Sequence, residues 1–231
     1  MTGSAKSTPA KLTIDIYSDV MCPWCIIGYR QLQTGLAQLQ GEIEAEVRWL
    51  PFELNPDMPP GGEPQVAHIA RKYGRTIEQA AAGREQMHEA GVRAGYSFAY
   101  AGEGKPPEGT MRNTFAAHKL LKWALIERGA AVQTRLKLAL FDAHFQHRRD
   151  VSDPAVLVEL AAAQGLDPAG ASAALDDPAL GAVVRREQRQ AIDLNITGVP
   201  AMIVQGKYLI PGAQDPEVYV SALRRAVERG I

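Results

Sequence analysis

The alternation of apolar and polar residues predicts two strands joined by a helix near the start of the chain. Residues 12–17 alternate and include β-branched side chains, which is typical of a half-buried strand. Residues 43–50 alternate in the same way. Because a helix connects the two predicted strands, we expect them to lie parallel in one sheet. That helix is predicted over about 23–40 by apolar residues at helical spacing: Ile26, Tyr29, Leu32, Leu36 and Leu39.

The middle of the chain has helical periodicity and no strand pattern. Residues 51–64 are rich in proline and glycine and are predicted to form a loop, as are residues 95–110. Helices are predicted over 65–74, 76–94, 111–128, 130–147, 154–164, 168–175 and 178–194. Four Asp-Pro pairs predict helix starts, because Asp caps a first turn and Pro fits its first position. They are Asp153-Pro154, Asp167-Pro168, Asp177-Pro178 and Asp215-Pro216.

The end of the chain returns to strand patterns. Residues 201–204 predict a short apolar strand, 205–207 a turn, 208–210 a returning strand and 216–229 a final helix. Since strands lie on both sides of the helical block, the block is predicted to interrupt one sheet domain. We therefore expect an α/β fold in which residues 11–62 and 178–231 form the sheet domain and residues 63–177 a large inserted all-helical domain.

The composition narrows the classes of partner. Of the 231 residues, 46% are hydrophobic and 22% charged, as in a globular protein. The formal net charge of −1 provides no positive field, so we expect no nucleic-acid partner. No apolar run reaches the roughly 18–20 residues that span a bilayer, so we expect no membrane association. Residues 1–10 lack the apolar segment of a secretion signal, and we therefore expect a cytoplasmic protein.

The chain has only two cysteines, Cys22 and Cys25, and this spacing indicates redox chemistry. A disulfide-stapled scaffold would use more cysteines, and no nearby side chains complete a four-ligand zinc site, so we expect no metal. Cys22 is placed at the start of the predicted helix, where backbone N–H groups and the helix dipole favour a thiolate at a lower pH than in a free thiol. Cys25, one turn later, is predicted to resolve a mixed disulfide. Pro23 fits the first turn, and Trp24 offers an apolar flank.

Val199-Pro200 stands directly before the predicted strand 201–204. The proline could simply start the strand. It could also be a cis proline that faces the cysteine pair and leaves the backbone of Val199 free to pair with an extended substrate. The spacing alone does not separate the two interpretations, but the cysteine pair and the order of predicted elements favour the cis proline.

Four segments together resemble the DsbA superfamily, and most closely its cytoplasmic FrnE-like branch. They are residues 18–28 (SDVMCPWCIIG), 52–56 (FELNP), 197–200 (TGVP) and 212–214 (GAQ). The resemblance implies a thioredoxin-like fold with a helical domain inserted over the redox site. It assigns Cys22 as nucleophile, Cys25 as resolving thiol and Pro200 as the cis proline beside Val199. The Pro-Trp dipeptide departs from the Pro-His of secreted DsbA proteins, which leaves a strongly oxidising potential in doubt.

The predicted function is that of a thiol–disulfide oxidoreductase acting on a protein or small-molecule disulfide or dithiol. It requires no cofactor, with glutathione as an optional redox partner or cosubstrate. One alternative is a glutathione-dependent isomerase or transferase of the kappa-class or 2-hydroxychromene-2-carboxylate isomerase type. These enzymes share the fold and the Asn-Pro loop, here Asn55-Pro56, but typically carry a single Ser at the position of Cys22. A second alternative is a non-enzymatic chaperone or binding module.

Further polar residues are weaker candidates for the site. Asn113 and His118 could line it from the helical block, or form a polar patch between domains. Asp19 could accept a proton or cap the loop before Cys22. The oligomeric state stays open, with a homodimer as one option.

Overall fold

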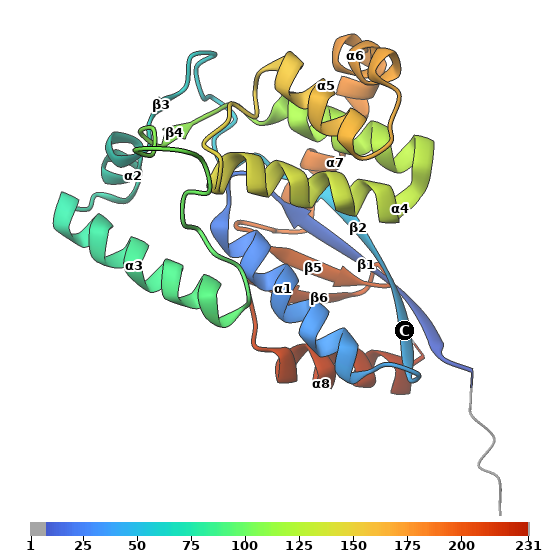
Figure 1. Ribbon diagram of the computed structural model, residues 1–231. Helices are drawn as coiled ribbons and strands as arrows, with labels where there is room; N and C mark the ends of the chain where they lie inside the picture. Colours follow the sequence, from blue (N-terminus) through green and yellow to red (C-terminus); the bar gives the residue numbers. More distant parts are fainter. Residues whose placement is uncertain (1–7, 231) are drawn as a thin grey trace, which may run out of the picture.

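A four-stranded sheet lies at the centre of the protein (Figure 1). The computed structural model describes residues 8–230, so the part of the N-terminal expectation that concerns residues 1–7 lies outside the described residues. The strands are β1 (Ala10–Ser18), β2 (Ile43–Pro51), β5 (Ala201–Val204) and β6 (Tyr208–Pro211), in the order β2-β1-β5-β6. β1 and β2 are parallel, while β5 and β6 each run antiparallel to the strand before them in this order. The predicted strand–helix–strand unit and the C-terminal hairpin are therefore confirmed.

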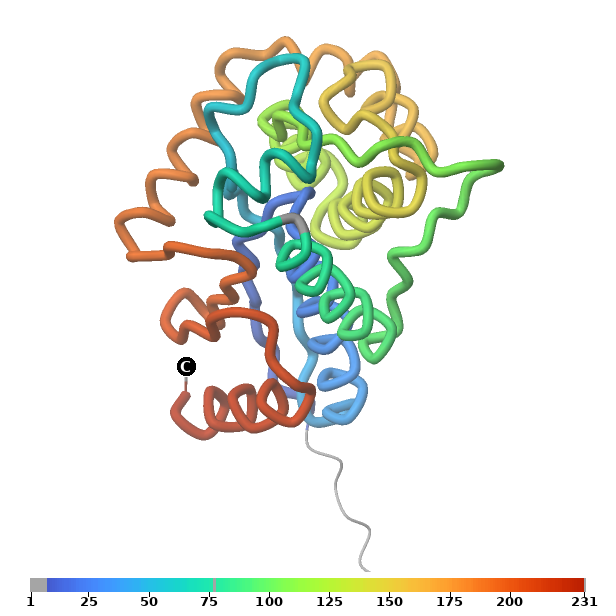
Figure 2. The backbone as a smooth tube through the Cα atoms, turned by 90° about the vertical axis from the view of Figure 1, so that its left-hand side faces the viewer, coloured from blue at the N-terminus to red at the C-terminus, as the bar shows by residue number. Residues whose placement is uncertain are grey.

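Helices cover both faces of the sheet. α1 (Pro23–Gln38) and α8 (Pro216–Glu228) lie side by side on one face, as both views show (Figures 1 and 2). Ile14 and Ile16 of β1 belong to the main hydrophobic core on that side. α7 (Pro178–Asp193) covers the other face, where Tyr17 and Ala191 share a smaller cluster. Both faces of β1 are thus buried at its carboxyl end, which is where the cysteine segment begins.

The block between β2 and α7 is mainly helical. Its helices are α2 (Gln65–Tyr73), α3 (Ile77–Arg93), α4 (Phe115–Phe145), α5 (Pro154–Ala163) and α6 (Pro168–Asp176). α4 spans the two predicted helices 111–128 and 130–147, and it is interrupted between them because Gly129 has non-helical backbone angles (φ 78°, ψ −179°). The predicted fold class, a thioredoxin-like α/β fold with a large helical insertion, is confirmed, but the insertion is not all-helical, because it contains two short strands at residues 63–64 and 110–111.

The prediction that a helix begins at residue 111 is wrong. Thr110–Met111 form a short strand, β4, which pairs antiparallel with β3 (Glu63–Pro64), and α4 begins only at Phe115. Oδ1 of Asn113 accepts a hydrogen bond from the backbone N–H of Phe115 at 2.9 Å, which fixes the helix start. Two-residue strands are too short to produce an alternating pattern, so the sequence could not reveal this ribbon.

Three of the four Asp-Pro pairs cap helices as predicted. The carboxylates of Asp153, Asp167 and Asp177 accept backbone N–H groups in the first turns of α5, α6 and α7, at 2.8, 2.8 and 2.7 Å. Asp215 is also the N-cap residue of α8, so this helix begins where predicted, but its side chain makes no capping hydrogen bond. Its Oδ1 accepts from Nε2 of Gln31 at 3.5 Å instead. The fixed φ of the following proline still favours the start of α8.

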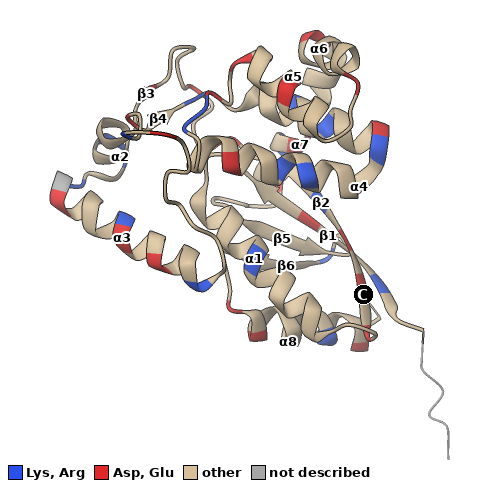
Figure 3. Cartoon of the chain, in the orientation of Figure 1, with Lys and Arg blue, Asp and Glu red and all other residues tan. Residues whose placement is uncertain are grey.

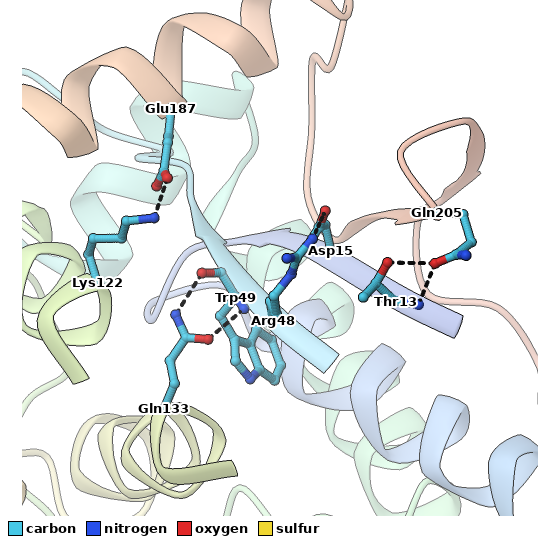
Figure 4. Close-up of polar contacts among 8 residues, drawn as sticks. All are labelled: Thr13, Asp15, Arg48, Trp49, Lys122, Gln133, Glu187 and Gln205. Carbon is cyan, nitrogen blue, oxygen red and sulfur yellow. Dashed lines mark hydrogen bonds and ion pairs between the residues drawn. The ribbon is translucent and has the colours of Figure 1, made fainter. Parts of the chain in front are cut away.

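Helix α4 also closes the open edge of the sheet. β2 is an edge strand, and the outward backbone groups of such a strand need partners. Oε1 of Gln133 accepts from the Trp49 N–H at 2.9 Å, and its amide nitrogen donates to the Trp49 carbonyl at 2.8 Å (Figure 4). The Gln133 side chain thus takes the place of a neighbouring strand. An ion pair between Lys122 and Glu187 joins α4 to α7 (Figure 4).

The division into a sheet domain and a helical domain at residues 62/63 and 177/178 stays a prediction. The two larger core clusters each contain side chains from both parts of the chain. Phe141 and Phe145 of α4 pack into the cluster around the sheet, and Val20 and Met21 pack into the cluster of the helical block. The two parts therefore share buried surface next to the cysteine segment.

Acidic and basic residues are interspersed on the helices, as α3 and α4 illustrate (Figure 3). This distribution agrees with the nearly balanced formal charge of the sequence. Across the described stretch of 8–230, no helix has both the length and the apolar character needed to cross a membrane.

Candidate active site

The two cysteines lie at the junction between β1 and α1. Cys22 is the N-cap residue of α1 and has an extended backbone (φ −89°, ψ 111°), while Pro23 occupies the first turn. The Cys25 N–H donates to the Cys22 carbonyl at 3.1 Å, which closes this turn. Both thiols are free; Cys22 is 4% exposed and Cys25 fully buried, whereas Trp24 is 44% exposed. The first sulfur is therefore closer to solvent than the second, with an exposed indole ring beside it.

The distant segment around Pro200 meets the cysteines. The Val199–Pro200 peptide bond is cis, and the Cys22 thiol donates to the Val199 carbonyl at 3.5 Å. Gly28 makes this approach possible, because a Cβ atom there would lie 3.1 Å from Cγ of Pro200 and 3.2 Å from Cα of Ala213. Residues far apart in the sequence thus form one surface around Cys22.

The pKa of Cys22 is not lowered in this structure, against the expectation from the helix N-terminus. The pKa of Cys22 is raised well above its ordinary value by its hydrogen bond with Cys25, by burial, and by the nearby negative charges. Burial disfavours ionisation of Cys25 too. The hydrogen bond from Cys22 and the positive charge of Lys137 outweigh that burial, so the pKa of Cys25 is lowered. Burial and the neighbouring sulfur therefore outweigh the helix N-terminus at Cys22.

Asp19 organises the loop before Cys22 from a buried position, 1% exposed. Its carboxylate accepts the backbone N–H of Leu54 at 2.7 Å and that of Met21 at 3.3 Å. Burial raises the pKa of this carboxyl, and the two backbone hydrogen bonds and the charge of Lys137 oppose that shift. Asp19 therefore caps the loop before Cys22, which was one of its two predicted roles.

His118 reaches the same buried region from α4. Its Nε2 lies 3.8 Å from Oδ1 of Asp19, which is beyond direct hydrogen-bonding distance, and this nitrogen has no hydrogen-bond partner in the structure. Burial lowers the pKa of His118 well below its ordinary value, so the ring is neutral. The structure thus brings His118 to the loop that carries the cysteines.

Lys137 is a residue that the sequence analysis missed. It lies on the second half of α4 and is 1% exposed, with its ammonium 5.3 Å from the ring centre of Trp49 and 4.9 Å from that of Phe141. Burial lowers the pKa of Lys137 to about 8, against the opposing effect of the negative charges of Cys25, Asp19 and Cys22. A pattern could have revealed it, because helical spacing places Lys137 on the same stripe as the buried residues Gln133, Leu140, Phe141 and His144.

Asn55 and Asn113 have structural partners instead of contacts with the cysteines. Oδ1 of Asn55 accepts from Nζ of Lys72 at 2.7 Å and lies 3.0 Å from Nε2 of His68, so it links the loop after β2 to α2. Asn113 is used at the start of α4, as described above. Neither residue forms a hydrogen bond with Cys22 or Cys25 in the part of the chain that the structure describes.

Other features of the molecule do not compete with this site. A groove of about 1400 Å³ between α1, β2 and α4 lies at the amino end of β1 and is not lined by either cysteine. Among residues 8–230, no group of three or more His, Cys, Asp or Glu side chains could hold a metal ion. The cysteine pair and its surroundings are therefore the best candidate for chemistry.

A sheet in the order β2-β1-β5-β6, with a Cys-x-x-Cys pair at the start of α1 opposite a cis proline, defines a thioredoxin-fold protein with a dithiol site. Comparison with known families agrees and is more specific. The chain matches the model of the DSBA-like thioredoxin domain family over residues 13–224. The protein belongs to this DsbA-like family of thiol–disulfide oxidoreductases, and the expected resemblance to the DsbA superfamily is confirmed.

Several individual proteins are similar over nearly the whole chain. The probable DsbA oxidoreductase SCO1869 of Streptomyces coelicolor is 32% identical, with a TM-score of 0.83 over 94% of this chain and 90% of that one. The protein YwbO of Bacillus subtilis is 28% identical over 212 residues, which cover 91% of this chain and 94% of YwbO. DsbM of Pseudomonas aeruginosa, a cytosolic disulfide reductase whose structure is also known with glutathione, shares the fold. It is 19% identical, with a TM-score of 0.60 over 94% of this chain and 98% of DsbM.

Proposed function

We propose that the protein catalyses dithiol–disulfide exchange, with Cys22 as the attacking thiol and Cys25 as the resolving thiol. The observation that carries this proposal is the position of the less buried sulfur at the start of α1, in contact with the carbonyl of Val199. Trp24 follows in the same motif and is exposed, and Pro200 is joined to Val199 by the cis peptide bond. The expected substrate is a protein or small-molecule disulfide, and glutathione is the expected redox partner.

The shared proton of the pair explains how a buried Cys22 can attack. The Cys22 thiol donates to the Val199 carbonyl in the resting structure, and Cys25, whose pKa is lowered, can accept its proton as a substrate disulfide approaches. The Cys22 thiolate then forms a bond to one substrate sulfur, and the second substrate sulfur leaves as a thiolate. Cys25, after losing its proton, attacks Cys22 and releases the first substrate sulfur. Two electrons pass to the substrate, both released thiolates take up protons, and Cys22 and Cys25 end as a disulfide.

Substrate binding is proposed at the segment before β5. The backbone of Val199 is proposed to pair with an extended substrate chain, since it lies outside the strands and beside the Cys22 thiol. The proposal also includes a cytoplasmic location in the FrnE-like branch. It is supported by the motif residues 18–28 and by the likeness in fold to cytosolic DsbM.

The direct test is insulin reduction and glutathione-dependent disulfide exchange by the wild-type protein and by C22S and C25S. We expect activity in the wild type and a loss of at least about a thousandfold in C22S, since the nucleophile is removed. C25S should accumulate a mixed disulfide. Activity that survives in C25S with glutathione would favour the isomerase or transferase alternative. Holdase activity that is indifferent to both substitutions, without exchange, would favour the chaperone alternative.

A further inference from the structure

Lys137 is buried without the partner that a buried charge normally requires. Lysines are almost never fully buried unless they are paired, because transfer of an ammonium from water is costly. In the described part of the chain, Lys137 forms no ion pair with a carboxylate, although eight pairs between Lys or Arg and Asp or Glu are present. The rings of Trp49 and Phe141 provide some compensation by cation–π contacts.

The groups that face this ammonium identify its role. The rings of Trp49 and Phe141 that hold the ammonium belong to the same buried cluster as Cys22 and Cys25. The negative or ionisable groups whose charges act on Lys137 are Asp19 from the loop after β1 and these two cysteines. His118, on its own helix, also lies within reach of its charge. The carboxylate of Asp19 is already occupied by the backbone N–H groups of Leu54 and Met21. The negative charge that remains without such partners is the thiolate of the cysteine pair, and it can face the Lys137 ammonium.

We propose that Lys137 is a positioning residue whose ammonium serves as the counter-charge for the thiolate shared by Cys22 and Cys25. The inference rests on the proposed function and deepens it. When the pair is reduced, the thiolate and the ammonium stabilise each other in a poorly solvated setting. When the pair becomes a disulfide, the negative charge disappears and the ammonium remains uncompensated. Lys137 therefore favours the reduced form, which makes the disulfide a stronger oxidant.

The inference gives the helical insertion a part in the chemistry. Lys137 belongs to α4, which lies in the predicted inserted domain, while both cysteines belong to α1 of the sheet domain. The same helix segment holds the edge of β2 through Gln133, one turn before Lys137. The position of the counter-charge thus depends on how α4 is seated against the sheet.

The test compares K137M with the matched control K119M. Lys119 is also a buried lysine of α4, 7% exposed, but its ammonium has a partner, because it donates to the Leu175 carbonyl at 2.5 Å. The equilibrium of the Cys22–Cys25 couple with a glutathione redox buffer is measured by thiol alkylation. In parallel, thiolate formation is followed by ultraviolet absorbance against pH.

We expect the equilibrium of K137M to shift about tenfold toward the disulfide, which corresponds to about 30 mV, and its thiolate to form at higher pH. K119M should match the wild type in both measurements, and K137R should restore part of the shift. A folded K137M with the wild-type equilibrium and titration would overturn the inference. Should the wild type form its disulfide reversibly but fail to exchange with insulin, the proposed function would be wrong, and the comparison of K137M with K119M would still decide the role of Lys137.

A second measurement needs no substitution. The coupling between two sites is reciprocal. The thiolate must therefore raise the pKa of Lys137 by as much as the Lys137 ammonium lowers the pKa of the thiol. NMR titration of the Lys137 ammonium in the wild-type protein should therefore give a lower pKa in the oxidised than in the reduced form. Equal titration in both forms would contradict the inference, whatever the variants do.

Discussion

The two sides of the redox site are built in different ways. The sheet side consists of contiguous motifs, in which Cys22 to Cys25 follow β1 directly and Val199-Pro200 precede β5. The side formed by the helical block consists of single residues one or more turns apart on α4, namely His118, Gln133 and Lys137. The first kind of site is visible as a short string of letters. The second becomes visible only when the helix is seated on the sheet, because its polar residues are buried by tertiary packing.

The largest expected effect on folding comes from the contact between the two sides. In Q133M the N–H and carbonyl of Trp49 lose their partners while side-chain length is kept, and unpaired buried polar groups cost about 1–3 kcal/mol each. We expect the free energy of unfolding to fall by about 3 kcal/mol, measured by urea denaturation. T134V, which removes only the hydrogen bond from Nε1 of Trp49, should cost about 1 kcal/mol. Equal losses in the two variants would refute the role given to Gln133.

On the helical side, the buried charge of Lys137 should lower the free energy of unfolding. The pKa of Lys137 is about 8 in the folded protein, below the ordinary lysine value of 10.5, so between these pH values the unfolded chain binds more protons and stability rises with pH. Below about 8 the buried charge is a constant cost. K137M removes it, and we expect K137M to be more stable than the wild type at pH 7 by about 2 kcal/mol. The difference should shrink as the pH rises through this window in urea denaturation; a K137M that is less stable at pH 7 would contradict this reading.

On the sheet side, the close approach of α1 to Pro200 should be sensitive to a single methyl group. In G28A the new Cβ would lie 3.1 Å from Cγ of Pro200 and 3.2 Å from the backbone of Ala213, and overpacking typically costs about 1–3 kcal/mol. We expect a loss near the low end of that range, together with slower disulfide exchange. Gly61 is a matched control, since no atom lies within 4 Å of its added Cβ. A G28A protein as stable and active as G61A would show that the contact is unimportant.

The smallest expected effect separates two Asp-Pro pairs that look alike in the sequence. Asp167 of the helical block accepts the Gly170 N–H at 2.8 Å, so D167A should cost about 1 kcal/mol. Asp215 of the sheet domain makes no such hydrogen bond to α8, so D215A should change stability by a few tenths at most. Thermal unfolding of the two variants measures the difference. A D215A loss as large as that of D167A would mean that the carboxylate caps α8 in solution.

The success of the sequence predictions also differs between regions of the fold. The alternation in residues 12–17 and 43–50 predicted the parallel strands, because both strands have at least one buried face along most of their length. The predicted break between two helices was found at Gly129 inside α4. The pattern failed at residues 110–111, where a two-residue strand leaves no periodicity. At Asp215 the helix start was predicted correctly, but the side chain accepts a hydrogen bond from Gln31 instead of capping the first turn.

At the site, residue types indicated the chemistry but not the electrostatics. The cysteine spacing predicted a dithiol centre, and Val199-Pro200 was expected to face it. The lowered pKa expected for Cys22 rested on the helix N-terminus alone. The structure adds burial and the second sulfur, which raise the pKa of Cys22, and Lys137, which lowers that of Cys25. Lys137 lies more than 100 positions from the cysteines, so no local pattern contains its contribution.

Mapping of the trapped intermediate tests the central claim most directly. C25S and C22S are each incubated with oxidised glutathione, and the adduct is located by mass spectrometry after digestion. The account predicts a glutathione mixed disulfide on Cys22 in C25S, formed much faster than any adduct on Cys25 in C22S, because Cys25 is fully buried. Equal rates in the two variants, or an adduct only on Cys25, would contradict the assignment of Cys22 as the attacking thiol.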